Sequence, residues 1–321
     1  MKIARRFLRV GGALTIAMMH TPMKQITVNQ VKRMIEAICN PTAGNGRGGK
    51  IGRQVEAALR QRGVPCRLTM TKGPGDATTL ARGFAAEGAE TVLAIGGDGT
   101  AFEVAQGLLG TETALGVIPA GTGNDFVKTI GVPLEPMAAL ERALQSAPQK
   151  TDVGQLNGRL FLNEIGTGFD VMVLTYAERA KRFCRGLLPY LYGVLQTLFR
   201  FRAIELTYQI DGGETCTAPV FVLAAANGGV IGGGIRIAPE AKADDGLLDI
   251  VVVDRIPKRY LIRRLIQLMQ GKILSFPETH YCRAKSIVFS APGMRVNVDG
   301  EIKAIPRAEA VVLPQALWIR R

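Results

Sequence analysis

The most constraining feature of the sequence is the stretch Thr91–Glu103, TVLAIGGDGTAFE, in which an apolar run ends in a glycine-rich turn. The run has no polar alternation, which is typical of a parallel strand covered on both faces. Gly96, Gly97 and Gly99 have no Cβ, so the backbone can turn sharply and approach a bulky group. Thr100 can cap a following helix, whose free N–H groups would face the same group. The stretch predicts a strand, a phosphate-binding loop and a helix.

Asp98 lies at the centre of this loop. A carboxylate beside phosphates is favoured mainly when a divalent cation lies between them. The implied ligand is therefore a nucleotide that holds a metal ion. A glycine-rich turn after a strand also forms without any ligand, so this loop alone does not decide between the two interpretations.

Other segments repeat the order of strand, polar loop and helix. Strands are expected at residues 34–39, 64–71 and 115–119. The segments that follow them are the loop NPTAGNGRG with a helix from Gly49 to Arg62, a helix that opens at Gly75-Asp76, and the loop AGTGNDF at residues 120–126. Strands and helices that alternate at this spacing predict a parallel sheet with ligand loops at the carboxyl ends of its strands. The glycine-rich loops would then meet in one crevice.

Beyond a helix expected near residues 136–147, the pattern changes to hairpins. Asn157-Gly158 and Asp211-Gly212-Gly213 each separate two short strand-like segments, which is a hairpin signal. More strands are expected at residues 221–227, 247–253, 286–290 and 294–300. The sequence predicts an α/β N-terminal domain at residues 34–152 and a β-rich C-terminal domain at residues 153–304.

Two helical segments interrupt the β-rich half, from Tyr176 to Arg202 and from Lys258 to Gln270. Both combine apolar residues with Arg or Lys, which is the pattern of an amphipathic helix. Such a helix packs its apolar side against the core, which is the more common case, or docks on a membrane. In the second case its cations contact lipid headgroups and its apolar side chains point toward the acyl chains.

Residues 1–33 contain seven Lys or Arg residues and no acid, in a chain whose formal net charge is +13. We expect a disordered or basic extension, or a segment upstream of the true start. An amphipathic anchor on a membrane surface is the alternative. The positive charge of the rest of the chain favours anionic partners, such as nucleotides or an anionic membrane surface.

The composition excludes several classes of protein and site. No apolar run reaches the roughly 18 to 20 residues that cross a bilayer, so any membrane contact is expected to be peripheral. The five cysteines are widely spaced and form no CxxC pair, which suits a reducing cytoplasm. Because His20 and His280 are the only histidines, the core can contain neither a histidine-rich metal site nor a Ser-His-Asp triad.

Several motifs occur in one order across residues 34–321. They are Asn40–Gly44 (NPTAG), Thr71 with Gly75–Thr78 (GDAT), Gly96–Thr100 (GGDGT), Ile118–Asp125 (IPAGTGND), Asp244–Asp249 (DDGLLD) and Asp299–Glu301 (DGE). With these motifs in this order, the sequence resembles the diacylglycerol kinase catalytic-domain family, especially the soluble bacterial YegS-like lipid kinases related to sphingosine and ceramide kinases. The combined motifs are far more specific than GGDGT alone, which phosphofructokinases and NAD kinases also contain.

This resemblance implies the fold of both domains. The first would contain a Rossmann-like parallel sheet of the phosphofructokinase and NAD kinase kind, and the second would be sandwich-like. Residues 305–321 are a candidate segment for returning to the first domain.

The resemblance also implies that ATP binds to the first domain. Asp98 would help to hold the catalytic Mg²⁺ at the ATP phosphates, where the metal neutralises charge that develops during transfer. Asn124 and Asp125 would support that site. The implied nucleotide contacts, all at the carboxyl ends of expected strands, are Asn40, Pro41, Thr42, Ala43, Gly44, Thr71, Gly97, Asp98, Gly99, Thr100, Ala101, Phe102, Glu103, Thr122, Asn124 and Asp125.

A structural Mg²⁺ and a catalytic carboxylate are implied in the second domain. The family's structural Mg²⁺ takes the carboxylate that matches Asp245 and the backbone carbonyls that match Lys242 and Leu247. An ordinary Asp-Gly turn before a strand is the alternative. Transfer to an alcohol needs a carboxylate near the hydroxyl to accept its proton. The implied acceptor is Glu301, with Asp299 close by, and the alternative is a hairpin turn with solvated acids.

We expect an ATP- and Mg²⁺-dependent lipid kinase that phosphorylates the hydroxyl of a membrane lipid such as diacylglycerol. It would be cytoplasmic, contact the inner face of the cell membrane transiently and bind no nucleic acid, and a homodimer is left open. Residues Asn227–Gly234, NGGVIGGG, either line the acceptor cleft or permit tight backbone packing. One alternative is an NAD kinase-like small-molecule kinase, which would not explain DDGLLD and DGE. Another is a catalytically silent regulator that binds nucleotide or lipid.

Overall fold

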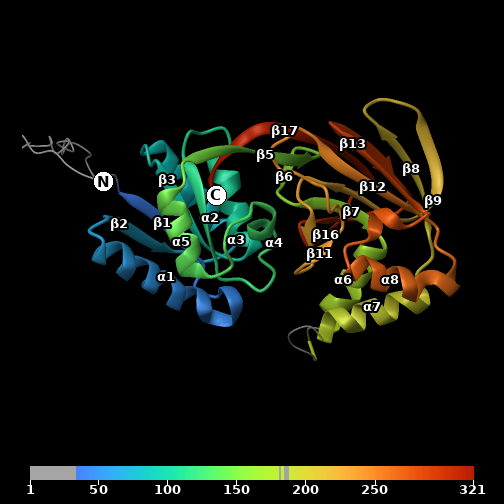
Figure 1. Cartoon of the computed structure of the whole chain (residues 1–321), viewed down its shortest axis with the longest axis horizontal. Coiled ribbons are helices and arrows are strands. Elements are labelled where there is room, and N and C mark those ends of the chain that lie inside the picture. The colour runs from blue at the N-terminus through green and yellow to red at the C-terminus, as the bar shows by residue number, and fades with distance from the viewer. Residues whose placement is uncertain (1–33, 181, 184–187) are drawn as a thin grey trace, which may run out of the picture. The chain divides into compact units, whose positions relative to one another are not determined.

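The computed structural model describes residues 34–180, 182–183 and 188–321. The expectation for residues 1–33 concerns a segment outside this range. The described residues form an α/β part with a parallel sheet and a β-rich part (Figure 1). This confirms the predicted fold class, while the domain boundaries near residues 152 and 304 stay predictions.

Four strands of the α/β part lie side by side and parallel. In spatial order they are β2 (Cys66–Met70), β1 (Ile35–Cys39), β3 (Thr91–Gly96) and β4 (Ala114–Pro119). β3 and β4 are buried along their whole length. This agrees with their unbroken apolar sequence, because a strand covered on both faces has no solvent side.

Helices follow the strands of this sheet and share one apolar core with them. The apolar sides of the helices supply buried residues such as Val55, Ala81 and Leu140. The helices are α1 (Ala43–Gln61), α2 (Asp76–Ala86), α3 (Asp98–Leu108), the short α4 (Asp125–Thr129) and α5 (Pro136–Gln145).

The start of α1 differs from the sequence prediction, which placed it at Gly49. Helical turns begin at Ala43, but Gly44, Asn45 and Gly46 interrupt them with φ values of 58°, 59° and 86°. A Cβ at Gly44 would lie 2.1 Å from the carbonyl oxygen of Ala120. Glycine therefore lets this turn press against the loop after β4, and the regular helix follows the turn.

The β-rich part contains the remaining strands. Asn157 and Gly158, with φ values of 47° and 83°, join the first two as predicted, because this hairpin turn needs left-handed backbone at both residues. The strands are β5 (Pro148–Leu156), β6 (Arg159–Phe161), β7 (Glu164–Gly168), β8 (Ile204–Ile210), β9 (Thr215–Ala226), β10 (Val230–Ile231), β11 (Ile235–Arg236), β12 (Leu248–Asp254), β13 (Thr279–Ala284), β14 (Ser286–Ser290), β15 (Arg295–Val298), β16 (Glu301–Ala304) and β17 (Arg307–Arg320).

β17 pairs with strands of both parts. The first half of β17 pairs with β14, and most of its length pairs with β5, in both cases antiparallel. Near the end of β17, Ile319 pairs in parallel with Leu115 of β4. The register with β5 shifts between Leu313 and Leu317, where Gln315 has a φ of 51°. A bulge of this kind lets one long strand bend. Residues 307–320 therefore continue the hydrogen-bonded sheet from the β-rich part to β4.

The first predicted helical segment, at residues 176–202, contains parts of two helices rather than one. These are α6 (Phe169–Ala180) and α7 (Leu188–Arg200). Pro189 lies in the first turn of α7, where its missing N–H is not needed, whereas it would break the interior of a longer helix. The second segment begins with a 3₁₀ turn at Lys258–Tyr260, continues as α8 (Leu261–Met269) and is followed by another 3₁₀ turn at Ile273–Ser275.

The β-rich part has its own apolar clusters. One joins β7, β9, β12, β14 and β17, and two smaller clusters lie under α6, α7 and α8. Among the described helices, none is long and apolar enough to cross a membrane.

Candidate functional site

A cavity lies where the loop after β1 meets the glycine turn after β3. The loops that follow β2 and β4, together with the start of α2, contribute Lys72, Gly73, Pro74, Ala77 and Gly121 to its lining. The strands thus bring together the loops that the sequence marks as ligand loops. The predicted nucleotide contacts that line the cavity are Asn40, Pro41, Thr42, Ala43, Gly44, Thr71, Gly97, Gly99, Thr100 and Glu103.

Asn40 connects two of these loops through its side chain. Its Oδ1 accepts hydrogen bonds from the backbone N–H of Thr42 (3.1 Å) and from the hydroxyl of the same residue (2.8 Å). Its Nδ2 donates to Oγ1 of Thr100, at the start of α3 (3.4 Å). The side chain of Asn40 therefore fixes the NPTAG loop relative to the GGDGT turn.

Glu103 holds a third loop in place. Its carboxylate accepts hydrogen bonds from the backbone N–H groups of Gly75 (2.9 Å) and Ala77 (3.2 Å), at the start of α2. The hydroxyl of Thr78 donates to the backbone carbonyl of Glu103 (2.9 Å). A carboxylate at a helix N-terminus satisfies N–H groups that have no partner within the helix. Glu103 therefore positions the second motif beside the cavity.

Gly121 and Gly97 lie against each other at the cavity. A Cβ at Gly121 would lie 2.5 Å from the Cα of Gly97 and 2.9 Å from Oδ1 of Asn124. Gly99, two residues further along the same turn, has open space around the position of its missing Cβ. Gly121 and Gly97 therefore approach each other too closely for a side chain, whereas Gly99 has room for one.

This difference gives a matched pair of variants. Gly121→Ala is expected to destabilise the protein by about 1–3 kcal/mol, because the added methyl group must displace backbone. Gly99→Ala is expected to change stability by less than about 0.5 kcal/mol. Urea unfolding of the two variants and the wild type measures both values. Equal stability of the two variants would contradict this description of the turn.

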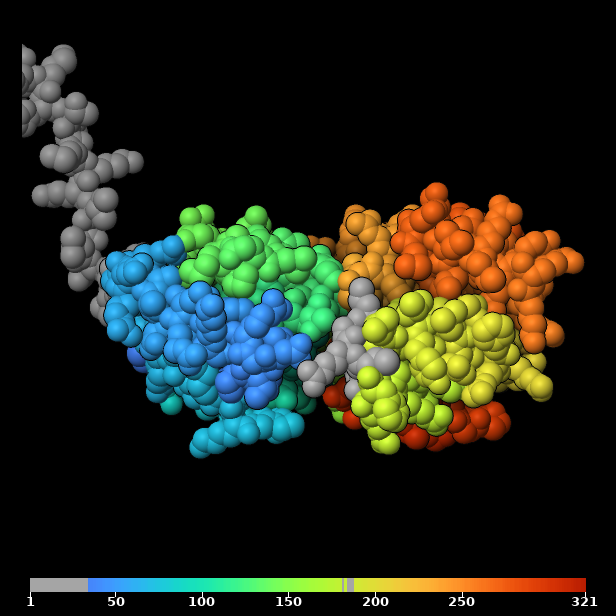
Figure 2. Space-filling model, turned by 90° about the horizontal axis from the view of Figure 1, so that it is seen from below, coloured from blue at the N-terminus to red at the C-terminus, as the bar shows by residue number. Residues whose placement is uncertain are grey.

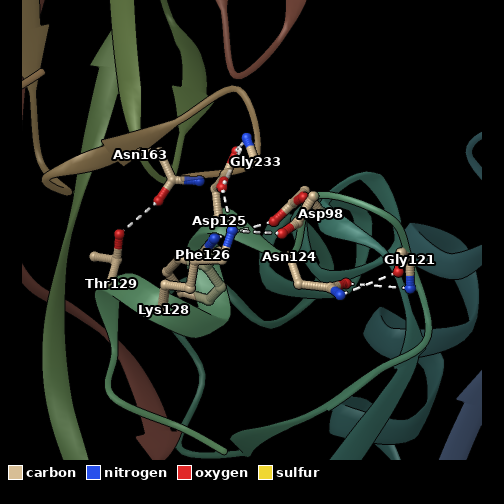
Figure 3. Close-up of polar contacts among 10 residues, drawn as sticks. Asp98, Gly121, Asn124, Asp125, Phe126, Lys128, Thr129, Asn163 and Gly233 are labelled. Atoms are coloured by element: carbon tan, nitrogen blue, oxygen red, sulfur yellow. Dashed lines mark hydrogen bonds and ion pairs between the residues drawn. The ribbon is translucent and has the colours of Figure 1, made fainter. Parts of the chain in front are cut away.

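Asp98 begins α3 beside the cavity, and its Oδ1 accepts the backbone N–H of Phe126 in α4 (3.0 Å; Figure 3). Burial raises the pKa of Asp98 above its usual value, and the negative charge of Asp125 raises this pKa further. The hydrogen bond from Phe126 acts in the opposite direction. Two carboxylates thus lie close enough to repel each other, and a cation beside Asp98 would relieve this repulsion.

Asp125 connects the loop after β4 to the glycine-rich segment between β10 and β11. Both of its carboxylate oxygens accept the backbone N–H of Gly233 (3.1 and 2.8 Å), and Nζ of Lys128 lies 3.0 Å from Oδ1 (Figure 3). Lys128 also donates to the carbonyl of Gly123 (2.8 Å). The carboxylate of Asp125 is therefore paired with a cation and holds the backbone at Gly233.

The remaining predicted nucleotide contacts have other surroundings. The side chain of Asn124 closes its own loop, with Oδ1 accepting from the N–H of Gly121 and Nδ2 donating to its carbonyl, both at 3.1 Å. Ala101 is buried, and Phe102 packs against the core of the α/β part. Thr122 is exposed beside Gly121. Contact with nucleotide stays a prediction for these four residues and equally for those that line the cavity.

Asp299 holds the turn that precedes Glu301. Its carboxylate accepts the backbone N–H groups of Leu162 (2.6 Å), Asn163 (2.9 Å) and Glu164 (3.0 Å). Burial raises the pKa of Asp299 to about 6, although these three hydrogen bonds lower it, and the charge of Asp98 contributes to the rise. Asp299 thus fixes its own turn to the backbone of residues 162–164, and the charge of Asp98 acts on it.

Glu301 is more exposed than Asp299 and is paired with two cations. Its Oε2 lies 3.0 Å from Nζ of Lys303 and 2.9 Å from a terminal nitrogen of Arg159. Lys303 first, and then Arg159, lower the pKa of Glu301 below its usual value. The guanidinium of Arg159 also lies 5.6 Å from the ring centre of Phe102 in α3. Arg159 therefore connects Glu301 to the helix that begins with Asp98.

Known proteins resemble this chain over nearly its whole length. Residues 35–156 match the model of the diacylglycerol kinase catalytic domain, and residues 163–321 match that of the YegS C-terminal NAD kinase beta sandwich-like domain. A diacylglycerol kinase of Mycobacterium tuberculosis is 32% identical over 293 residues, which are 89% of this chain and 94% of the relative. The chain belongs to the diacylglycerol kinase catalytic-domain family.

Two more relatives agree with this assignment, which confirms the resemblance inferred from the motifs. A probable YegS-like lipid kinase of Chromohalobacter salexigens is 33% identical over 283 residues, 86% of this chain and 90% of the relative. The crystal structure of a diacylglycerol kinase from Bacillus anthracis matches with a TM-score of 0.74 and 26% identity. The match covers 90% of this chain and 96% of that structure.

The residues near Asp98 fit the magnesium that this family implies. Mg²⁺ is usually bound by one or two carboxylates together with substrate phosphates and water. Asp98 is a carboxylate beside the cavity, and its neighbour Asp125 is already paired with Lys128. A single ligating carboxylate at this point therefore suits a metal that is held mainly by the phosphates of the nucleotide.

The predicted structural magnesium site at Lys242, Asp245 and Leu247 stays a prediction. One carboxylate oxygen of Asp245 accepts the backbone N–H of Leu247 (3.2 Å), and the other lies 3.8 Å from a terminal nitrogen of Arg283. Arg283 also lies 3.8 Å from the buried carboxylate of Asp249. Within residues 34–180, 182–183 and 188–321, no group of three or more His, Cys, Asp or Glu side chains is arranged to hold a metal.

A buried carboxyl pair lies next to the Asp299 turn. Asn297 donates from Nδ2 to Glu164 (3.0 Å) and to Asp170 (3.2 Å). Burial raises the pKa of Glu164 well above its usual value, and the charge of Asp170 raises it further. Burial also raises the pKa of Asp170, to about 6. The two carboxyls are therefore buried titratable groups at the edge of the site.

This pair predicts how stability depends on pH. A carboxyl whose pKa is higher in the folded protein binds its proton more tightly there, so its contribution to stability is present at low pH. That contribution is lost as pH rises through the raised folded pKa values. Glu164→Gln removes one buried charge and keeps an oxygen that can accept from Asn297.

We expect Glu164→Gln to raise the melting temperature by about 3 °C at about pH 8. At about pH 5 the change should be smaller, because the raised pKa of Glu164 favours the protonated carboxyl as pH falls. Differential scanning calorimetry at both pH values measures the difference. Glu205→Gln, an exposed change on β8, is the control and should have no effect at either pH. A variant that is less stable than the wild type at high pH would contradict the assignment.

Asp152 is a connecting residue that the sequence analysis did not identify as part of the site. Its fully buried carboxylate accepts the backbone N–H groups of Gly246 and Gln315, both at 2.7 Å. The side chain of Asn227 donates to its carbonyl (3.0 Å). Asp152 thus joins the DDGLLD turn to β17. The one sequence signal that could have marked this residue is an aspartate within an expected strand.

Arg159 and Lys128 were also missed, since surface cations are too common to be recognised without their partners. Their importance is visible only from the carboxylates they contact, Glu301 and Asp125.

Proposed function

We propose that this protein transfers the γ-phosphate of ATP to the hydroxyl group of a membrane lipid such as diacylglycerol. The observation that supports this most strongly is the cavity itself. Loops after β1, β2, β3 and β4 surround it, and Asp98 lies beside it at the start of α3. Backbone N–H groups at glycine turns and a helix N-terminus are suited to phosphates. The family assignment, through relatives named as diacylglycerol kinases and lipid kinases, supports the same reaction.

Asp98 is proposed to hold the metal that accompanies ATP. When bound, Mg²⁺ would neutralise charge on the phosphates as the phosphoryl group leaves ADP. The protein supplies a carboxylate whose position is fixed by the N–H of Phe126. The raised pKa of Asp98 means that protonation at low pH would compete with metal.

Glu301 is proposed to act on the acceptor hydroxyl. The hydroxyl oxygen forms a bond to the γ-phosphorus, the bond from that phosphorus to the ADP oxygen breaks, and the hydroxyl proton passes to the carboxylate of Glu301. Arg159 and Lys303 keep this carboxylate ionised and orient it. A low pKa weakens a base, but phosphoryl transfer has a loose transition state that depends more on position than on base strength.

The glycine-rich segment before β11 is proposed to border the acceptor side. Gly233 is tied to Asp125 by the two hydrogen bonds described above, so the segment lies beside the loop after β4. A hollow next to it is lined by Lys128, Thr129, Arg236 and glycines 229 and 234. This position fits the cleft-lining alternative for residues 227–234.

The proposed function is tested by transfer of label from γ-labelled ATP with Mg²⁺ to a set of acceptors in mixed micelles. The lipid acceptors are diacylglycerol, phosphatidylglycerol, a sphingoid base and a polyprenol, and NAD and fructose 6-phosphate are included as water-soluble acceptors. Label in a lipid that disappears in Glu301→Ala is the expected result. Label in NAD alone would support an NAD kinase-like enzyme, and ATP binding without transfer would support a regulator.

A further inference from the structure

The outer sides of α7 and α8 expose many large apolar side chains. We call the surface formed by the following residues the α7–α8 face: Leu188, Leu191, Tyr192, Leu195 and Phe199 of α7, Tyr260 before α8, and Ile262, Ile266 and Met269 of α8. Elsewhere in the part of the chain that the structure describes, large apolar side chains are exposed only at Met34, Leu134, Phe183 and Val311. Such a concentration marks an interaction surface.

α8 has apolar side chains both on the side that faces the core and on its outer side. Leu261, Leu265 and Leu268 pack against the apolar clusters of the β-rich part. Ile262 and Ile266 recur at the same helical spacing but are 67% and 53% exposed. The alternative of a purely core-facing amphipathic helix explains the first set and leaves the second without a function.

The two helices form one continuous surface. Leu198 of α7 and Leu265 of α8 pack against the same cluster, together with Phe221 of β9. Figure 2 views the molecule from the side on which these helices lie, with α7 in yellow next to α8 in orange. The exposed side chains of both helices can therefore contact one flat partner together.

Positive charge surrounds the apolar residues. Residues 188–203 and 255–275 contain no Asp or Glu. Exposed cations on or beside the helices include Arg200, Arg202, Lys258, Arg259 and Arg263. Arg259 also lies over the ring of Tyr260, with 4.8 Å between the guanidinium and the ring centre. Apolar side chains among cations, without acids, complement a surface of anionic headgroups over acyl chains.

We propose that the α7–α8 face docks on an anionic lipid bilayer. Ile262, Ile266 and Met269 enter the boundary between headgroups and acyl chains, while Arg259 and Arg263 contact lipid phosphates. A second copy of this chain fits the face poorly, because a symmetric contact would place the same acid-free, cationic surface on both sides.

The inner side of α7 faces the buried acids near the candidate site. Tyr190 is only partly exposed, and a Cβ at Gly232 would lie 3.6 Å from its hydroxyl oxygen. Burial raises the pKa of Tyr190, and the charges of Asp170 and Glu164 raise it further. α7 therefore has one side on the proposed membrane surface and the other at the acid pair, which suits an enzyme that takes its substrate from a bilayer. The role of α7 in taking substrate from a bilayer rests on the proposed function, whereas the docking of the α7–α8 face on a bilayer does not.

The test measures binding to sedimented vesicles without ATP. The vesicles contain phosphatidylcholine with about one third phosphatidylglycerol, or phosphatidylcholine alone. We expect the wild type to prefer the anionic vesicles. The triple variant Ile262→Ser, Ile266→Ser, Met269→Ser should bind them at least about tenfold more weakly. Leu134→Ser, a similar change at a residue that is 52% exposed in the α/β part, should bind like the wild type.

A charge variant keeps the test independent of any folding defect in the triple variant. The double variant Arg259→Gln, Arg263→Gln should also bind about tenfold more weakly and show a smaller effect of added salt. Unchanged vesicle binding in both variants would overturn the proposal. Loss of a dimer in sedimentation velocity, with vesicle binding intact, would assign the face to a second copy instead.

Phosphoryl transfer to a dispersed short-chain diacylglycerol separates this proposal from the proposed function. Both variants should retain this transfer, because none of the altered residues lies in the candidate site. Vesicle binding without any transfer by the wild type would contradict the kinase assignment and leave the docking surface standing. Phosphoryl transfer by the wild type, with no effect of the variants on vesicle binding, would support the kinase assignment and contradict the docking surface.

Discussion

Replacing Asp98 with Asn is expected to lower kcat/KM for phosphoryl transfer by about 10³-fold or more. Asn keeps an oxygen that can accept the N–H of Phe126, so the start of α3 should stay in place. The variant loses only the negative charge that the proposed metal site requires. The defect should therefore appear in transfer and in Mg²⁺ dependence, and not in stability.

Steady-state kinetics over a range of Mg²⁺ concentrations measures this effect. Asp254→Asn is the matched control, because Asp254 is a partly exposed aspartate at the end of β12 that pairs with His280. It should change kcat/KM by less than about twofold. Full transfer activity in Asp98→Asn would exclude Asp98 from metal binding.

Replacing Glu301 with Gln is expected to lower kcat by about 10²-fold or more, which is the usual contribution of a positioned proton acceptor. Gln has nearly the same shape and can still contact Arg159, so binding of ATP should be unchanged. The loss should therefore appear in kcat with little effect on the KM for ATP.

The pH profile distinguishes the roles of the two carboxylates. Lys303 and Arg159 lower the pKa of Glu301 below that of an ordinary glutamate. The carboxylate of Glu301 therefore stays ionised to a lower pH than an ordinary glutamate would. Burial raises the pKa of Asp98, so Asp98 gains a proton first as pH falls. The residual activity of Glu301→Gln should therefore keep the acid limb of the wild type, because Asp98 and Asp299, whose pKa values are raised by burial, are unchanged in that variant.

Glu309→Gln controls for loss of an exposed acid, since Glu309 lies on β17, the next strand in the chain, and pairs with Arg307. It should retain full activity. If Glu301→Gln kept more than about half of the wild-type kcat, Glu301 would not be the proton acceptor, and a carboxylate nearer the cavity would take that role.

The parts of the fold that could be predicted are those whose cause is local. The apolar run before Gly96 and the left-handed pair Asn157-Gly158 each determine their own backbone, and the structure confirms both. The break between α6 and α7 was not predicted, because charged residues such as Lys181 and Arg182 also occur on the surfaces of helices. Gly186 and Pro189 are the two signals that could have marked it. The exposure of Ile262 was equally hidden, since an apolar residue on a helix usually faces the core.

The same distinction holds for the candidate site. The glycine loops were found because a close approach of backbone requires glycine at particular positions, as at Gly121 and Gly97. Glu103 was assigned to the nucleotide, and only the folded chain shows that its carboxylate caps α2. Asp152 and Arg159 act through partners more than 90 residues away in the chain, at Gly246 and Glu301. No local pattern contains such a pairing.

The most direct test of the proposed reaction combines diacylglycerol in mixed micelles, γ-labelled ATP and Mg²⁺ with wild-type protein and with Asp98→Asn. The expected result is labelled phosphatidic acid, formed with one ADP for each lipid phosphorylated, and its near absence in the variant. Wild-type protein that binds ATP yet labels neither diacylglycerol nor another lipid alcohol would contradict the assignment of this chain as an active lipid kinase.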